Sequence, residues 1–354
     1  MTNYHPQSMK FGYLEFRYGK KSGAFDENFA SQNSSINIGD NIQTLAVRNL
    51  FNRIGIPSAQ VIGVDRDDLP NYCGESVMLL MNGCFYNRCF PLAENITPVF
   101  FGFNTASESV VIRNRSMFQA HQPIGCRDAA TMELMTKHNI LAYVSGCATL
   151  TLDRRDSEPV VAKTIISHGS GSGEFPGSLL EHIPASLLGN AAFIFQRSSA
   201  KTFPLDDAGL KRADKIARSY LEKYRMSASL VITPLLHVAS PCLAMGIPVI
   251  IARKDLDARF TAINKLTPVH TPDNFGSINW QPETVELEPI KIVMENVVRQ
   301  VIKGESAART DIDFLSGVYD TENKPTGGPA NPKGKSLKSR GKLYQFIHCH
   351  WLRK

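Results

Sequence analysis

The chain has 354 residues, of which 43% are hydrophobic and 20% charged, a composition typical of a folded globular protein and unlike that of disordered or fibrous chains. This length accommodates two domains, each with its own buried core. The seven cysteines are scattered and include no Cys-x-x-Cys pair, which argues against a disulfide framework and against a structural zinc site.

The formal charge of +6 is not spread evenly along the chain. Residues 331–354 contain seven Lys and Arg residues and no acid, a charge of +7 that leaves the rest of the chain at −1. A folded body that is nearly neutral does not predict a nucleic-acid partner. We expect residues 316–354 to be a disordered basic tail, which makes weak contact with an anionic membrane surface.

The first residues are polar and lack the apolar core of a signal peptide. No apolar run approaches the roughly 18–20 residues of a membrane span. We therefore expect a cytoplasmic protein, peripheral at most to the inner face of the membrane.

The first candidate site is the segment from Asn37 to Asn41, which precedes an apolar helical pattern. Asp40 or Asn41 is expected to be the N-cap of this helix, and Gly39 would let a ligand approach the backbone closely. Capping alone is the simpler interpretation of the same residues.

Short apolar runs follow along the chain and alternate with helical patterns. Their length and lack of polar alternation are typical of buried parallel strands. The expected strands are residues 77–81, 98–103, 141–144, 192–195, 230–233 and 249–252. Apolar residues at three-and-four spacing predict helices over 210–224 and 290–301. This alternation indicates a doubly wound α/β architecture.

The segment 123–131 predicts a short strand that ends at Cys126 and turns into a helix. Arg127 beside a helix N-terminus would form an anion site, since its guanidinium adds to unpaired backbone N–H groups. The alternative is that Arg127 pairs with Asp128 or with another acid on the surface.

Two further segments follow strands. Ser145 and Gly146 come just after the strand at 141–144 and are expected to line a crevice, whereas Cys147 reads as a buried thiol. The polar stretch 153–177 contains the glycine-serine segment 167–173. It is expected to be a loop between domains of residues 1–157 and 158–315. A glycine-rich phosphate cradle is the alternative, although the segment lacks the G-x-G-x-x-G spacing and a helix directly after it.

The segment 233–250 is typical of half a Rossmann unit: a strand, a turn, a short helix and a second strand. His237 falls where the first strand ends and the helix begins, the position at which open α/β sheets bind ligands. An imidazole there can act as a general acid or base, or bind an anion when it is charged.

Taken together, these segments resemble the polysaccharide pyruvyl transferase family. The matching motifs occur in family order and cover most of residues 36–252. They are Ile38-Gly39-Asp40 with Ile42-Gln43, Asn82-Gly83, residues 123–128, residues 145–152, and residues 228–250 around Leu236-His237. The resemblance implies a GT-B-like α/β fold, with two Rossmann-like domains whose parallel sheets face a central cleft. The N-terminal domain would be the acceptor side and the C-terminal domain the donor side.

The reaction implied by the resemblance moves a pyruvyl group from phosphoenolpyruvate to hydroxyls of a saccharide or lipid-linked oligosaccharide, usually as a ketal, in the synthesis of a surface glycan or exopolysaccharide. Arg127 would hold the donor's phosphate or carboxylate, and Leu236 and His237 would bind the donor. His237 would also transfer a proton. The chain departs from the family at Leu235, where an Arg is frequent, and at Cys84, where an aromatic residue is frequent.

The expected catalytic residues are His237, Arg127 and Asp40, with Asp65 and Asp128 as other candidates for the base. The expected substrate-binding residues are Leu236, Gly39, Asn41, Asn82, Gly83, Asp128, Ser145 and Gly146. The scheme requires no cofactor and no metal, with phosphoenolpyruvate as the donor substrate.

Two alternatives remain at this stage. One is a GT-B glycosyltransferase with a nucleotide-sugar donor, for which Asp255 or Asp257 would bind the ribose. The other is a glycan-binding member of the fold without catalytic activity.

Overall fold

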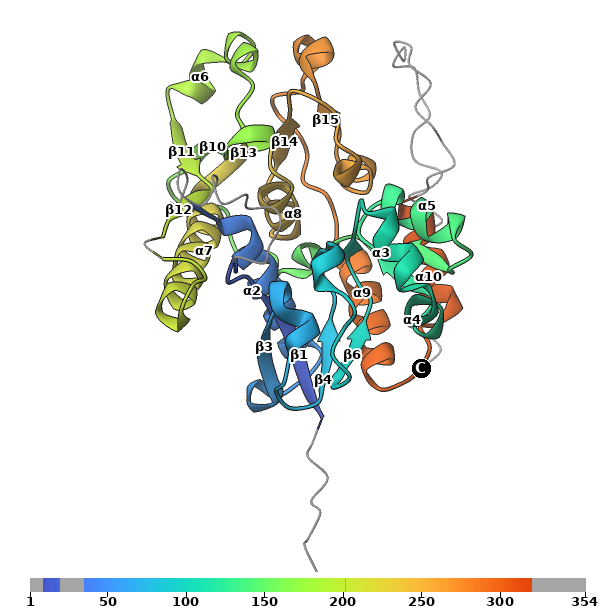
Figure 1. The fold of residues 1–354 in the computed structure, drawn as a ribbon. Coiled ribbons are helices and arrows are strands. Elements are labelled where there is room, and N and C mark those ends of the chain that lie inside the picture. Colours follow the sequence, from blue (N-terminus) through green and yellow to red (C-terminus); the bar gives the residue numbers. More distant parts are fainter. Residues whose placement is uncertain (1–8, 20–34, 201, 320–354) are drawn as a thin grey trace, which may run out of the picture. The chain divides into compact units, whose positions relative to one another are not determined.

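The first half of the described chain forms two parallel sheets from short strands (Figure 1). The computed structural model describes residues 9–19, 35–200 and 202–319. One sheet has the order β3-β1-β4-β6 and a second the order β5-β7-β8-β9. The strands are β1 (Lys10–Glu15), β3 (Val61–Asp65), β4 (Val77–Leu80), β5 (Gly83–Cys84), β6 (Ile96–Val99), β7 (Phe103–Asn104), β8 (Ile124–Cys126) and β9 (Ala142–Val144).

Backbone hydrogen bonds join these two sheets. The Met81 amide donates to the Val99 carbonyl (2.9 Å), and the Gly83 amide donates to the Gly102 carbonyl (3.2 Å). β4 thus leads into β5 and β6 into β7. The run 98–103, expected to be one strand, is interrupted at Gly102, whose φ of +69° ends the extended backbone.

The second half builds a five-stranded parallel sheet in the order β11-β10-β13-β14-β15. Its strands are β10 (Lys163–His168), β11 (Ala191–Phe195), β13 (Ala228–Thr233), β14 (Val249–Ala252) and β15 (Val269–His270). The two main sheets share one strand order. In the first half β3 lies on one side of β1, and β4 and β6 lie on its other side. In the second half β11 lies on one side of β10, and β13, β14 and β15 lie on its other side. This order places a topological switch point beside β1 and another beside β10, where open α/β sheets bind ligands.

The expected loop at 153–177 is wrong in part, because it contains the interior strand β10. Ile165 and Ile166 of this strand are fully buried. Its polar residues Thr164 and Ser167 are buried too, and the Ser167 hydroxyl hydrogen-bonds the hydroxyl of Tyr224 (2.7 Å). Tertiary partners thus satisfy polar groups that made the stretch read as solvent-exposed.

Helices cover the sheets, and the two predicted from spacing are confirmed as α7 and α9. The α-helices are α2 (Ile38–Arg53), α3 (Glu108–Arg113), α4 (Arg115–Ala120), α5 (Ala129–Lys137), α6 (Ala185–Leu188), α7 (Asp207–Ser227), α8 (Leu236–Ala244), α9 (Glu288–Ile302) and α10 (Arg309–Val318). A mixed α/β fold with parallel sheets, as expected, is confirmed. No helix within the described ranges combines the length and apolarity required to cross a membrane.

Elements of the two halves contact one another, and buried residues of both halves belong to one hydrophobic core. α2 packs along α7 (Figure 1), and β2 (Ser35–Asn37) pairs antiparallel with β12 (Arg197–Ser199). α9 contacts β6, and α10 contacts β9, so helices late in the chain cover strands of the first half. The division at 157/158 stays a prediction. α10 extends past the expected boundary at 315, and the rest of the basic tail lies outside the described residues.

Substitution in β10 tests its place in the core. Ile166 and Phe193 are register partners on β10 and β11, yet Ile166 is fully buried and Phe193 is 60% exposed. We expect Ile166→Ala to lower the free energy of unfolding by about 2–5 kcal/mol, because it leaves a cavity in the core. The matched Phe193→Ala should cost about 1 kcal/mol or less. Urea unfolding measures both, and equal costs would contradict a buried β10.

Candidate functional site

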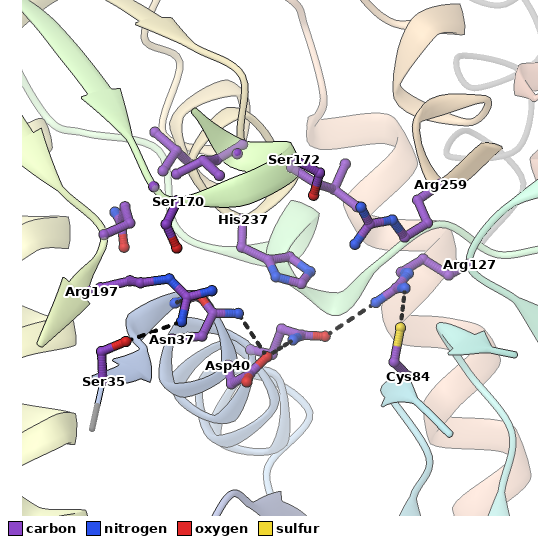
Figure 2. Close-up of a pocket in the computed structure, with 18 of the residues that line it drawn as sticks. Ser35, Asn37, Asp40, Cys84, Arg127, Ser170, Ser172, Arg197, His237 and Arg259 are labelled. Atoms are coloured by element: carbon purple, nitrogen blue, oxygen red, sulfur yellow. Dashed lines mark hydrogen bonds between the residues drawn. The ribbon is translucent and has the colours of Figure 1, made fainter. Parts of the chain in front are cut away.

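A cavity of about 370 Å³ lies at the carboxyl ends of strands from both halves (Figure 2). From the first half it is lined by residues that follow β1 and β8, and by Cys84 of β5. From the second half it is lined by the segment after β10, by the turn between β13 and α8, and by Arg253 after β14. Both switch points thus contribute to one cavity.

The lining is rich in arginine. Among the described residues, the cavity is lined by six arginines and one carboxylate, that of Asp40. The arginines are Arg66, Arg88, Arg127, Arg197, Arg253 and Arg259. Behind the lining, Asp67 pairs with Arg66 and Arg88, and Asp257 pairs with Arg253 and Arg259. The two carboxylates offset part of the charge, and the cavity keeps a net positive lining suited to an anion.

Arg127 is buried, being only 3% exposed, and occupies the turn between β8 and α5. Its guanidinium donates to the Cys84 Sγ (3.0 Å) and to the Gln43 Oε1 (3.5 Å), while its Nε has no partner among the described residues. No ion pair with Asp128 forms within the described structure, because the Asp128 carboxylate accepts from the Thr131 amide and caps α5. The Arg127 charge therefore has no carboxylate partner among the described residues.

His237 lies in the first turn of α8, as expected from its place after a strand. Its Nε2 is buried and has no hydrogen-bond partner among the described residues. Burial lowers the pKa of His237 well below its usual value, and the charges of Arg127 and Arg259 lower it further. The imidazole is thus neutral at pH 7 in the free protein, with a ring nitrogen ready to hydrogen-bond a ligand.

Gly39 lies against His237. A Cβ on Gly39 would lie 3.1 Å from the His237 Cβ, so the absence of a side chain lets α2 approach α8 closely. The expected N-cap at Asp40 or Asn41 is wrong: Asn37 caps α2, and its side chain accepts from the Gly39 amide (3.1 Å). Since Asn37 supplies the cap, Asp40 lies in the first turn of the helix and its side chain lines the cavity.

Asp40 is held by three polar side chains. The Tyr18 hydroxyl donates to its Oδ2 (2.9 Å), and the amides of Asn37 and Gln43 donate to its Oδ1 (3.3 and 3.4 Å). Burial raises the pKa of Asp40, and this effect outweighs the opposing attraction of Arg66 and the hydrogen bond from Tyr18. Gln43 joins Asp40 to Arg127, so a carboxylate with raised basicity lies one side chain from the cation.

The glycine-serine segment after β10 also lines the cavity, through Gly169, Ser170, Ser172 and Gly173. It closes on itself, because the Gly169 amide donates to the Gly173 carbonyl (2.7 Å). A Cβ on Gly173 would lie 2.5 Å from the Leu235 Cδ2, which explains a glycine at this point. The segment lies beside the start of α8, which has no capping side chain. Backbone N–H groups at such an end favour anions.

Five predicted site residues line the cavity: His237, Arg127, Asp40, Leu236 and Gly39. Six others do not, within the described structure; they are Asn41, Asn82, Gly83, Asp128, Ser145 and Gly146. Asn82, for example, accepts from the Ala148 amide (2.9 Å), and the Ser145 hydroxyl donates to the Cys126 carbonyl (3.1 Å). These motif residues hold the turns that follow the strands.

Sequence reasoning missed most of the arginines. Arg253 directly follows β14, a strand that the sequence predicts. Arg127 was singled out because it follows a predicted strand, and the same reasoning identifies Arg253. Arg66 follows β3, a strand that the sequence analysis does not predict, and Arg88 and Arg259 lie in one-turn 3₁₀ helices (Asn87–Cys89 and Ala258–Phe260) too short to give a periodic signal. Within the described ranges, no group of three or more His, Cys, Asp or Glu residues could hold a metal ion.

No protein-family model matches the chain, and no curated protein matches it. Among solved structures, an uncharacterized protein from Klebsiella pneumoniae is 14% identical, with 75% of this chain and 92% of that chain covered and a TM-score of 0.41. MnaA from S. aureus, solved with UDP, is 10% identical, with 84% of this chain and 99% of that chain covered and a TM-score of 0.39. The structure of the accessory secretory proteins 1, 2 and 3 of Streptococcus pneumoniae is 11% identical, with 82% of this chain and 56% of that chain covered and a TM-score of 0.30. Likenesses this weak indicate no function.

The neutral state of His237 has a measurable consequence for stability. Its pKa is lower in the folded chain than the roughly 6.5 of an unfolded one, so the unfolded state binds more protons as the pH falls. The wild type should therefore lose stability relative to His237→Asn as the pH falls from about 7.5 through 6.5 and on toward the lowered pKa of the folded chain, with most of the loss below about 6.5. Urea unfolding of both proteins across this range measures the difference. Parallel pH profiles would contradict a buried neutral imidazole.

Proposed function

We propose that this chain is a pyruvyl transferase, which moves the pyruvyl unit of phosphoenolpyruvate to hydroxyls of a saccharide or lipid-linked oligosaccharide in the cytoplasm. The observation that carries the proposal is the cavity itself. Among the described residues, several arginines, a single carboxylate and a neutral imidazole whose Nε2 has no hydrogen-bond partner face a small volume. A compact donor with both a phosphate and a carboxylate suits this lining.

The donor site is assigned to the groups around His237. Arg127 and Arg259 would bind the carboxylate and phosphate, since guanidinium groups match both in a bidentate manner. The glycine-serine segment and the start of α8 would add backbone N–H groups for the phosphate oxygens. These donors are already in place before binding, which favours stabilisation of charge that develops in the transition state.

His237 and Asp40 then have separate roles. Protonation of the methylene carbon of phosphoenolpyruvate makes the adjacent carbon electrophilic, and His237 transfers that proton. Anion binding next to His237 favours its protonated form, which it lacks in the free protein. Asp40, with its raised pKa, accepts the proton of the attacking hydroxyl. Inorganic phosphate leaves, and a second hydroxyl closes the ketal.

The GT-B-like arrangement belongs to this proposal. Two sheets that share a doubly wound strand order and bring their carboxyl ends to one cavity support it. A nucleotide-sugar donor is less favoured, because Asp257, one of the residues expected to bind its ribose, pairs with Arg259 and Arg253. Neither Asp255 nor Asp257 is among the described residues that line the cavity.

Phosphate release from phosphoenolpyruvate tests the proposal, with a panel of lipid-linked and nitrophenyl sugars as acceptors. We expect release that depends on the acceptor. Arg127→Ala should lower kcat/KM about 10²- to 10³-fold through lost charge stabilisation. His237→Ala should lower it about 10²- to 10⁴-fold through lost proton transfer.

Matched controls come from the surface. Arg309, whose side chain is 86% exposed on α10, and the exposed His121 should tolerate alanine without loss of rate. Turnover of a nucleotide-sugar, with no acceptor-dependent phosphate release, would overturn the proposal. Near-full activity of both site variants would overturn the residue assignment even if pyruvyl transfer is observed.

A further inference from the structure

Cys84 differs from the other described cysteines in its surroundings. Cys89, Cys126, Cys147 and Cys242 are buried, and Cys73 is exposed. Cys84 is half-buried at the end of β5 and lines the arginine-rich cavity. A small molecule that enters the cavity can therefore reach its sulfur.

The Cys84 sulfur lies beside the guanidinium of Arg127, which forms no ion pair with a carboxylate among the described residues. The Arg127 Nη2 donates to the sulfur (3.0 Å), and Figure 2 shows this contact with Arg259 on the same side of the cavity. Arg127 is 3% exposed, and its Nε has no partner among the described residues. Two buried nitrogens at the cavity, the Arg127 Nε and the His237 Nε2, have no hydrogen-bond partner among the described residues, and each could bond a ligand there.

The geometry points to Cys84 as a site of covalent modification, directed by charge, for small electrophiles that carry a carboxylate or a phosphonate. The anionic group would bind Arg127 and its neighbours and so hold the electrophilic carbon next to the sulfur. Reactive cysteines lie in such electropositive, partly exposed surroundings. This site needs only an anion in the cavity, so it does not depend on pyruvyl transfer.

The reaction is a substitution at carbon. The thiol first loses its proton to solvent buffer; in the free protein this proton is donated to the Asn104 Oδ1 (2.6 Å). The thiolate then attacks the electrophilic carbon, and the C–S bond forms as the bond to the leaving group breaks. With iodoacetate, iodide leaves and a carboxymethyl thioether remains on Cys84.

Two alkylating reagents of similar size distinguish attraction of an anionic reagent to Cys84 from mere exposure of its sulfur. Iodoacetate is anionic and iodoacetamide is neutral, and both meet the same fraction of thiolate, so their rate ratio at one cysteine reports the effect of charge. Peptide mapping of the full-length protein gives this ratio for Cys84 and for the exposed Cys73. We expect the ratio at Cys84 to exceed that at Cys73 about 10-fold or more.

Competition and substitution complete the test. Inorganic phosphate at millimolar concentration should slow iodoacetate at Cys84 and not at Cys73. Arg127→Gln should bring the ratio at Cys84 toward that at Cys73, whereas the surface control Arg309→Gln should not. Equal ratios at both cysteines in the wild type, or a ratio at Cys84 that phosphate leaves unchanged, would overturn the inference. These two readouts need no variant, so a folding defect in Arg127→Gln leaves the test intact.

Discussion

The buried charge of Arg127 is the constraint on which the arrangement of the cavity depends. A guanidinium taken out of water is costly unless polar groups and charges surround it. Here the Cys84 sulfur and the Gln43 amide accept its hydrogen bonds, and no described carboxylate does. Asp128 is close enough in sequence, yet it is held in the cap of α5. The protein thus keeps a cation in its interior that an anionic ligand would satisfy.

The same charge sets the state of the groups around it. It contributes to the low pKa of His237, and through Gln43 it connects with Asp40, whose pKa is raised. The two shifts bring the pKa values of His237 and Asp40 toward each other, because the value of the imidazole falls and that of the carboxyl rises. An anion bound at Arg127 would change both pKa values, so anion binding and the protonation of these two groups are linked by electrostatics.

The expectations from sequence succeed where a pattern is local. The three-and-four spacing at 210–224 is confirmed as α7, and the apolar run 249–252 is confirmed as β14. They fail where tertiary partners decide. The segment of β10 was expected to be a loop because the stretch 153–177 is polar and contains the glycine-serine segment 167–173. In the structure Ser167 is buried, and its hydroxyl hydrogen-bonds that of Tyr224, from a helix distant in sequence. The N-cap of α2 is Asn37 and not Asp40 or Asn41 as expected, because Asn37, Asp40 and Asn41 are all good capping residues and the sequence alone does not choose among them.

For the site, the sequence alone singled out Arg127, His237 and Asp40, because residues where a strand ends and a helix begins lie at the edge of the sheet at which open α/β folds bind ligands. It also established that the net charge of +6 belongs to the last residues, so that any positive site in the body is local. Only the tertiary structure decided which positive residues meet. Arg66, Arg88 and Arg259 converge with Arg127 because loops from separate sheets end at one cavity, and no spacing along the chain records that distance.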